Sequence, residues 1–149
     1  MNLDIRKAVK EDFDRCVEIR GLTRDNPISR EILIEYGVTK EIWEPNIAAG
    51  TFEGFVAEDR GGIVGYCFGN PKTSEILVLA LLPDYEGNGL GKKLLNAMVN
   101  RLLEFGLNEV WLAASPDPSL RAHGFYRHLG WRPTELCDQS DDEVLKYKK

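Results

Sequence analysis

The sequence has few of the features that place a chain in a membrane, outside the cell or around a metal ion. Its longest apolar run, residues 76–82, is far too short to cross a bilayer, and its charged N-terminus lacks the apolar core of a signal peptide. Three cysteines and two histidines, with no Cys-x-x-Cys pair, disfavour a structural zinc site and suit a reducing compartment. We therefore expect a cytoplasmic protein with no metal site and no membrane contact. We also expect each cysteine to be a small buried or half-buried side chain (Cys16, Cys67 and Cys137).

An excess of positive charge is also missing, because the formal net charge of the chain is −5. Broad electrostatic binding to nucleic acid is therefore disfavoured. An acidic balance is compatible with a cationic substrate such as an amine, but it is also common among soluble proteins.

The 149 residues fit one α/β domain, 1–149, with enough length for a sizeable core. Alternating or continuous apolar residues predict strands, and apolar residues at three- and four-residue steps predict helices. The expected strands are residues 3–8, 51–59, 63–70, 74–82, 109–114, 131–137 and 143–148. The expected helices are residues 10–22, 89–105 and 119–129, with one or two short ones within 23–50. The Gly61-Gly62 pair should supply the positive φ values of a tight hairpin turn between the second and third strands.

A glycine-rich loop, PDYEGNGLG at residues 83–91, follows a strand with the composition of a fully buried one and opens the clearest amphipathic helix. The start of a helix carries unpaired N–H groups and a partial positive charge. Glycines let the backbone approach an anion without a Cβ between them. The loop therefore predicts a site for a phosphate or pyrophosphate.

The spacing of the glycines excludes two common phosphate-binding motifs. A Walker loop needs an earlier glycine where Glu86 stands, and a Ser or Thr where Lys93 stands. The dinucleotide pattern Gly-x-Gly-x-x-Gly fails because Gly87 and Gly89 lead to Lys92, and Gly89 and Gly91 lead to Leu94. A glycine-rich turn without a ligand is the remaining alternative.

Two segments resemble the sequence motifs of the GNAT acetyltransferases. Residues 75–95, EILVLALLPDYEGNGLGKKLL, resemble motif A, and residues 119–131, SLRAHGFYRHLGW, resemble motif B. The resemblance implies the GNAT fold, in which about four helices flank a twisted, mixed and mostly antiparallel sheet of six to seven strands. It also implies transfer of an acetyl group from acetyl-CoA to a primary amine of a small molecule or peptide, by direct attack in a ternary complex. The alternative is a non-catalytic CoA-binding sensor or docking module with the same fold.

The same resemblance assigns the cofactor contacts. The pantetheine arm is expected along the main chain of the strand before the loop, where an exposed N–H such as that of Leu81 would polarise the thioester carbonyl. Lys92 and Arg121 either contact phosphates or are solvated cations. The expected cofactor-binding residues are Leu79, Ala80, Leu81, Gly87, Asn88, Gly89, Leu90, Gly91, Lys92, Ser119 and Tyr126.

Two catalytic residues follow from the resemblance. Tyr126 matches the tyrosine of motif B, which would protonate the leaving thiolate, unless it is only a core aromatic next to Phe125. Glu75 opens the strand before the loop, where several family members carry a basic glutamate, and partial burial would raise its pKa. It is equally well interpreted as a surface acid at the end of a strand, with a water chain acting instead. His123 and His128 are rival titrating groups on a helix face.

The sequence departs from the family pattern at two positions. Glu86 stands where Arg or Gln is common, and a carboxylate beside a pyrophosphate weakens binding unless its side chain points to solvent. Ser119 stands where Asn is common and is either a hydrogen-bond donor to the cofactor or a helix cap. The segment 24–50 is expected to determine the acceptor, although its aromatic and acidic residues also fit a packed underside. A homodimer is possible for such enzymes.

Overall fold

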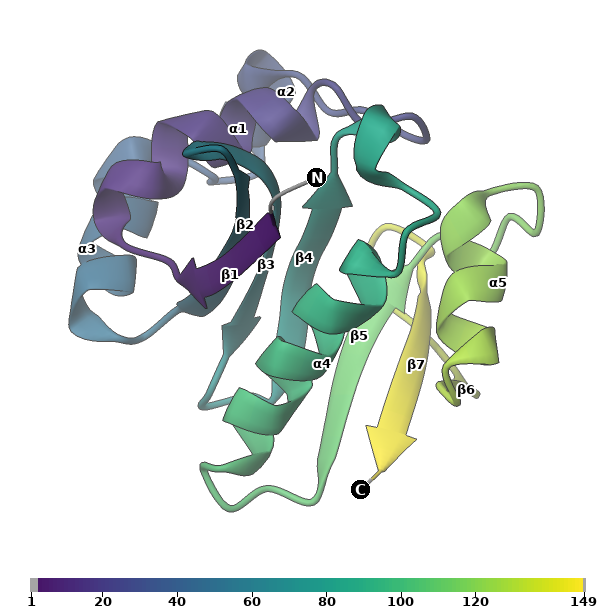
Figure 1. The fold of residues 1–149 in the computed structure, drawn as a ribbon. Helices are drawn as coiled ribbons and strands as arrows, with labels where there is room; N and C mark the ends of the chain where they lie inside the picture. Colours follow the sequence, from purple (N-terminus) through teal and green to yellow (C-terminus); the bar gives the residue numbers. More distant parts are fainter. Residues whose placement is uncertain (1–2, 149) are drawn as a thin grey trace.

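The computed structural model, which describes residues 3–148, is built on a seven-stranded sheet with the order β1-β2-β3-β4-β5-β7-β6 (Figure 1). Every neighbouring pair of strands is antiparallel except β4 and β5, which are parallel. The strands are β1 (Leu3–Lys7), β2 (Glu53–Asp59), β3 (Gly62–Asn70), β4 (Glu75–Leu81), β5 (Glu109–Ala114), β6 (Arg132–Cys137) and β7 (Glu143–Lys148). The mixed, mostly antiparallel sheet expected from the sequence is confirmed.

Five α-helices and two 3-10 turns accompany the sheet within the described chain. They are η1 (Lys10–Asp12), α1 (Phe13–Arg20), α2 (Arg30–Glu35), α3 (Lys40–Ala49), η2 (Pro83–Tyr85), α4 (Leu90–Leu103) and α5 (Arg121–His128). The expected helix at 10–22 is thus a 3-10 turn followed by α1. The segment 23–50 forms two helices, which brings the number of α-helices to five rather than about four.

Two hydrophobic clusters lie on the two sides of the sheet. One contains the apolar face of α4, with Leu94, Met98 and Leu102 fully buried. The other contains the buried face of α1, with Phe13 and Ile19. The helical spacing of these residues makes each helix amphipathic, so both faces of the sheet are covered (Figure 1). No helix within residues 3–148 combines the length and apolar character needed to cross a bilayer.

The hairpin between β2 and β3 turns at Arg60 and Gly61, which have φ values of 53° and 85°. The expectation that Gly61 and Gly62 supply the two positive φ values is therefore wrong by one residue. Gly62 is already the first residue of β3 and pairs with Asp59. A two-residue turn with two positive φ values matches the strand twist, and here Arg60 accepts the left-handed conformation that Gly62 was expected to take.

Strands β4 and β5 pair at one register position, Glu75 with Trp111, and then diverge (Figure 1). The junction is held by a hydrogen bond from Trp111 N to Ser74 O at 3.1 Å and by another from Ser74 Oγ to Glu109 O at 2.8 Å. Beyond this point the edge of β4 that faces β5 has no strand partner in the described sheet. The parallel pair therefore opens into a V toward the glycine-rich loop.

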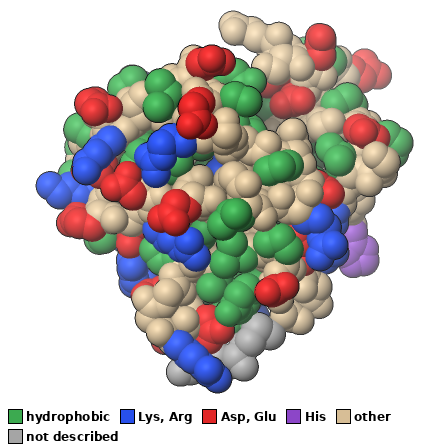
Figure 2. Space-filling view, turned by 90° about the horizontal axis from the view of Figure 1, so that it is seen from above, with side chains coloured by type: hydrophobic (Ala, Val, Ile, Leu, Met, Phe, Trp, Pro, Cys, Tyr) green, Lys and Arg blue, Asp and Glu red, His purple; other side chains and the backbone are tan. Residues whose placement is uncertain are grey.

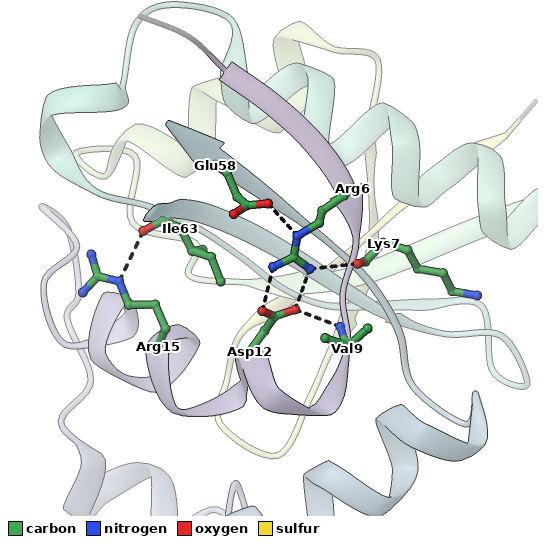
Figure 3. Close-up of polar contacts among 7 residues, drawn as sticks. All are labelled: Arg6, Lys7, Val9, Asp12, Arg15, Glu58 and Ile63. Atoms are coloured by element: carbon green, nitrogen blue, oxygen red, sulfur yellow. Dashed lines mark hydrogen bonds and ion pairs between the residues drawn. The ribbon is translucent and has the colours of Figure 1, made fainter. Parts of the chain in front are cut away.

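A buried carboxylate ties the start of α1 to the first two strands (Figure 3). Asp12 is 7% exposed and accepts hydrogen bonds from Nη1 and Nη2 of Arg6, both at 2.9 Å, and from Val9 N at 2.8 Å. Arg6 Nε also donates to Glu58 of β2 at 2.6 Å. Farther along α1, Arg15 Nε donates to Ile63 O in β3 at 3.2 Å. These contacts fix α1, and with it one wall of the cavity described below, against the sheet.

Candidate active site

A cavity of about 840 Å³ lies in the opening between β4 and β5. It extends from the glycine-rich loop and α5, on the α4 side of the sheet, to α1 on the other side. Residues of β4 from Ile76 to Leu81 form one wall and residues of β5 from Leu112 to Ala114 form the other. The cavity is therefore built by the divergence of the two strands, and it connects the two faces of the sheet.

The glycine-rich loop reaches this cavity with its backbone uncovered. Gly87 and Gly89 both have a φ of 81°, and Gly89 is the N-cap of α4. Within residues 3–148 no side-chain cap hydrogen bond closes the start of this helix, because its N-cap is a glycine. A Cβ at Gly89 would have no neighbour within 4 Å. Open space in front of uncapped N–H groups is the geometry that binds an anion.

Glu86 was expected to point to solvent if a pyrophosphate binds beside it. The structure instead shows its side chain largely buried. Its side chain is 14% exposed and accepts a hydrogen bond from Arg24 Nε at 3.1 Å. Arg121 Nη1 lies 3.6 Å from the same oxygen. The negative charge at this position is therefore offset by two guanidinium groups.

The loop after α1 also contacts the start of α5. Asp25 Oδ2 accepts a hydrogen bond from the main-chain N of Arg121 at 2.9 Å, which satisfies a first-turn N–H of α5. Together with the Arg24–Glu86 contact, this connects three segments at the cavity: the α1–α2 loop, the glycine-rich loop and α5. Both residues belong to the segment 24–50, which was expected to determine the acceptor, but the sequence pattern singled out neither of them.

Both signs of charge occur around this end of the molecule. Figure 2 views the molecule from above and shows acidic and basic side chains interspersed with hydrophobic ones, with no extended patch of one sign on that face. Attraction of an anion at this end therefore depends on local groups, namely the glycine-rich loop and the nearby cations.

The unpaired edge of β4 presents main-chain groups to the cavity. Leu82 N donates to Val64 O in β3 at 2.9 Å. Because successive residues of a strand direct their N–H groups to opposite edges, those of Leu81 and Leu79 face away from β3. Leu79, Ala80 and Leu81 all line the cavity. This edge could receive an extended ligand in the manner of an added strand.

Tyr126 lies on the cavity wall at the α5 side. It is 8% exposed, and its ring packs edge-on against Phe125 and Trp131 at centroid distances of 5.2 and 6.0 Å. Burial raises the pKa of Tyr126, the thiol of Cys67 adds to this effect, and the charge of Arg20 opposes it. The phenol is therefore protonated at neutral pH, as a proton donor must be.

Glu75 lies at the closed vertex of the V, next to the cavity-lining Ile76. Burial raises the pKa of Glu75, and the negative charge of Asp138 raises it further. A second carboxylate, Asp142, lines the cavity itself, and burial together with Asp138 and Asp141 raises its pKa. The sequence did not point to Asp142, because it lies in an acidic turn between β6 and β7.

The structure brings most of the expected cofactor-binding residues together. Those that line the cavity are Leu79, Ala80, Leu81, Gly87, Gly89, Gly91, Lys92 and Tyr126. Leu90 is buried in the core under the loop, and Asn88 is an exposed residue between two lining glycines. His128 also lines the cavity.

Ser119 is not the cap of α5. The N-cap is Leu120, and the Oγ and N of Ser119 donate instead to Asp117 Oδ1 at 2.8 and 2.9 Å. The capping interpretation of Ser119 is therefore wrong, because α5 begins at Arg121, one residue too late for Ser119 to be its N-cap. Cys137 is exposed, contrary to expectation, whereas Cys16 and Cys67 are buried.

The family model for "Acetyltransferase (GNAT) family" matches residues 12–131. The match covers most of the chain, and the protein therefore belongs to this family. An uncharacterised N-acetyltransferase of Chlorobaculum tepidum is 29% identical over 127 residues, which are 82% of this chain and 78% of the relative.

Solved structures show the same fold. The PaiA N-acetyltransferase from Thermoplasma acidophilum, in complex with coenzyme A, has a TM-score of 0.84 over 100% of both chains at 22% identity. YncA from Salmonella typhimurium, with acetyl-CoA, has a TM-score of 0.67 over 99% of this chain and 94% of its own at 16% identity. At these identities the likeness establishes the fold alone.

Proposed function

We propose that this protein transfers an acetyl group from acetyl-CoA to a primary amine of a small molecule or peptide, by direct attack in a ternary complex. The observation that carries the proposal is the cavity between β4 and β5. It joins the uncapped glycine-lined start of α4, the free edge of β4 and the phenol of Tyr126 in one continuous space. The complexes of the two solved structures with coenzyme A and acetyl-CoA agree with this choice of cofactor.

The cofactor would lie along groups already present. The N–H groups around Gly87 and Gly89 would bind the pyrophosphate, with Arg121 and Lys92 supplying positive charge. The outward N–H groups of β4 would hydrogen-bond the extended arm, and that of Leu81 would polarise the thioester carbonyl. When bound, the cofactor supplies an activated acetyl thioester.

The chain must also move two protons. An ammonium with a pKa of about 10.4 is not nucleophilic at neutral pH, so a base must take its proton. We assign this role to Glu75, which would receive the proton through a chain of waters, because Ile76 rather than Glu75 lines the cavity. Tyr126 would donate its proton to the departing thiolate, whose pKa is about 8.5 by analogy with cysteine.

The test is thiol release from acetyl-CoA with a panel of primary amines, with acetyl-CoA binding measured alongside by calorimetry. Turnover of an amine supports the acetyltransferase. Saturable binding without turnover of any amine would indicate a non-catalytic CoA-binding module. Absence of binding at millimolar acetyl-CoA would contradict both.

A further inference from the structure

Arg20, the last residue of α1, lines the part of the cavity that lies on the α1 side of the sheet. Its two side-chain hydrogen bonds both leave from Nη1, to Thr23 Oγ1 at 3.2 Å and to Asn26 O at 2.8 Å. Within residues 3–148, Nε and Nη2 donate no hydrogen bond. The guanidinium therefore keeps two adjacent N–H directions for another acceptor.

No carboxylate of the described chain pairs with Arg20. Other arginines near the site do have such partners, since Arg24 and Arg121 both pair with Glu86. Burial lowers the pKa of Arg20, and the phenols of Tyr66 and Tyr126 oppose that effect. An arginine stays charged even so, and a half-buried cation without a counter-ion is costly to maintain.

The other charged groups on the cavity wall are already engaged or belong to other parts of it. Asp25 accepts the main-chain N–H of Arg121, and Glu86 accepts from Arg24. Asp142 lies in the turn between β6 and β7, and both of these strands lie on the far side of β5 from β4. The α1 side of the cavity is lined by polar residues of the loop after α1 (Thr23, Asp25 and Asn26) and by apolar or aromatic side chains (Phe13, Val17, Ile28, Leu77 and Tyr66). A guanidinium with two free N–H directions beside such an apolar wall selects for a single anionic group on an otherwise apolar ligand.

We propose that Arg20 binds a carboxylate of the acceptor, so that the acceptor is an amino carboxylic acid with an apolar side chain. The free Nε and Nη2 edge matches the two oxygens of a carboxylate, and the apolar lining receives the side chain. A polyamine is disfavoured because its positive charges would face an unneutralised cation. A peptide N-terminus is disfavoured because its first carbonyl is an amide. This inference rests on the proposed acetyltransferase function, because it assigns the α1 side of the cavity to the acceptor.

The test compares leucine, methionine and phenylalanine with their amides, pairs that differ only in the carboxylate. The N-acetylated forms of each pair are titrated calorimetrically into the protein, with and without CoA. We expect at least one acid to bind, or be acetylated, about tenfold better than its amide, because a charged hydrogen bond is lost in the amide. In Arg20→Gln the acid and its amide should bind about equally well, whereas Arg20→Lys should retain part of the preference for the acid. Affinity for CoA should be the same in all three proteins.

Arg30→Gln is the matched control, since Arg30 is an exposed arginine at the start of α2, lines no part of the cavity within the described residues, and pairs only loosely with Asp14 at 3.7 Å. It should keep the preference for the acid. Amides or polyamines that are acetylated as well as the acids would overturn the role of Arg20 while leaving the acetyltransferase intact. Equal or absent binding of every acid and amide would overturn it too. Failure to bind CoA would instead overturn the proposed function.

Discussion

The carboxylate of Glu86 lies 3.1 Å from Nε of Arg24, a residue 62 positions earlier in the chain. Arg24 is in the loop after α1, and Glu86 is in the loop that begins α4. The pair joins the α1 side of the cavity to the side formed by the glycine-rich loop. It also explains how an acidic residue is accommodated next to an anion site, because the charge of Glu86 is neutralised locally.

Replacing Glu86 with glutamine should strengthen the binding of acetyl-CoA. The change removes one negative charge next to the pyrophosphate and keeps the length of the side chain. We expect the Kd for acetyl-CoA to fall about three- to tenfold at low salt, and the gain to shrink at high salt as the charges are screened. Glu104→Gln removes the same charge from an exposed position at the C-terminal end of α4 and should leave the Kd unchanged. Weaker binding by Glu86→Gln would show that the two arginines need the carboxylate to hold their positions.

Replacing Tyr126 with phenylalanine should slow turnover without affecting cofactor binding. The ring would keep its contacts with Phe125 and Trp131, while the proton donor would be lost. General acid catalysis typically contributes about 10²- to 10⁴-fold, so kcat should fall by at least about a hundredfold. Tyr147→Phe is the control, because Tyr147 also stacks on Trp131 but lines no part of the main cavity. Full activity in Tyr126→Phe would remove the phenol from the mechanism.

The base should be visible in the pH dependence of kcat/KM. The pKa of Glu75 is raised by burial and by Asp138, so activity should decline on acidification at a pH above the usual glutamate value of about 4.3. Protonated Glu75 cannot accept the ammonium proton, which makes the loss occur as the pH falls. Glu75→Gln should lower kcat at least about tenfold and abolish this acidic limb. If Asp142→Asn abolished the limb and Glu75→Gln kept it, the base would be Asp142.

The Arg6–Asp12 pair should stabilise the fold most strongly at neutral pH. Asp12→Ala removes two guanidinium hydrogen bonds and the acceptor for Val9 N–H. We expect a loss of about 2 kcal/mol in the free energy of unfolding, below the value for a fully buried pair because solvent reaches Arg6. Asp14→Ala should change it by less than about 0.5 kcal/mol, since the ion pairs of Asp14 are exposed and 3.7 Å or longer.

The stabilisation by Asp12 should disappear in acid. Burial raises the pKa of Asp12, but the hydrogen bonds from Arg6 and Val9 lower it more, and the folded-state pKa is below the usual value. A carboxylate with a depressed pKa contributes stability above the unfolded-state pKa and loses it as the pH falls through the folded-state pKa. The stability difference between the native protein and Asp12→Ala should therefore shrink below about pH 3.9 in denaturant titrations. A difference independent of pH would contradict the ion-pair explanation.

The parts of the fold that were predictable from the sequence depend on local patterns. The apolar spacing of Leu94, Met98 and Leu102 predicted α4 and the face that it buries. The glycines at 87, 89 and 91 predicted a backbone anion site at the start of that helix, and their placement on the cavity wall agrees with it. Such features depend on residues that are close together in the sequence, so they can be recognised in a single sequence.

The contacts that the sequence did not predict join distant segments. Nothing local indicates that Arg24 reaches Glu86 or that Asp25 reaches the start of α5. The same holds for Arg20, whose proposed role depends on its having no ion-pair partner within residues 3–148 rather than on a motif. Ser119 shows a local error of a different kind, since it was weighed as the cap of α5 but the helix begins one residue later, with Leu120 as its N-cap. The exact start of a helix is decided by its three-dimensional contacts, which spacing does not give.

Calorimetric titration of acetyl-CoA into the native protein, Gly89→Ala and Gly106→Ala tests the anion site at the start of α4 most directly. Both glycines have positive φ values, 81° and 89°, and a Cβ at either would meet no atom within 4 Å. The two variants therefore introduce the same backbone strain, one before α4 and the other after it. The native protein and Gly106→Ala should bind acetyl-CoA with the same Kd. Gly89→Ala should bind it at least about tenfold more weakly, because the added methyl group enters the space in front of the helix N–H groups. Native affinity in Gly89→Ala, or no saturable heat from the native protein at millimolar acetyl-CoA, would contradict the account.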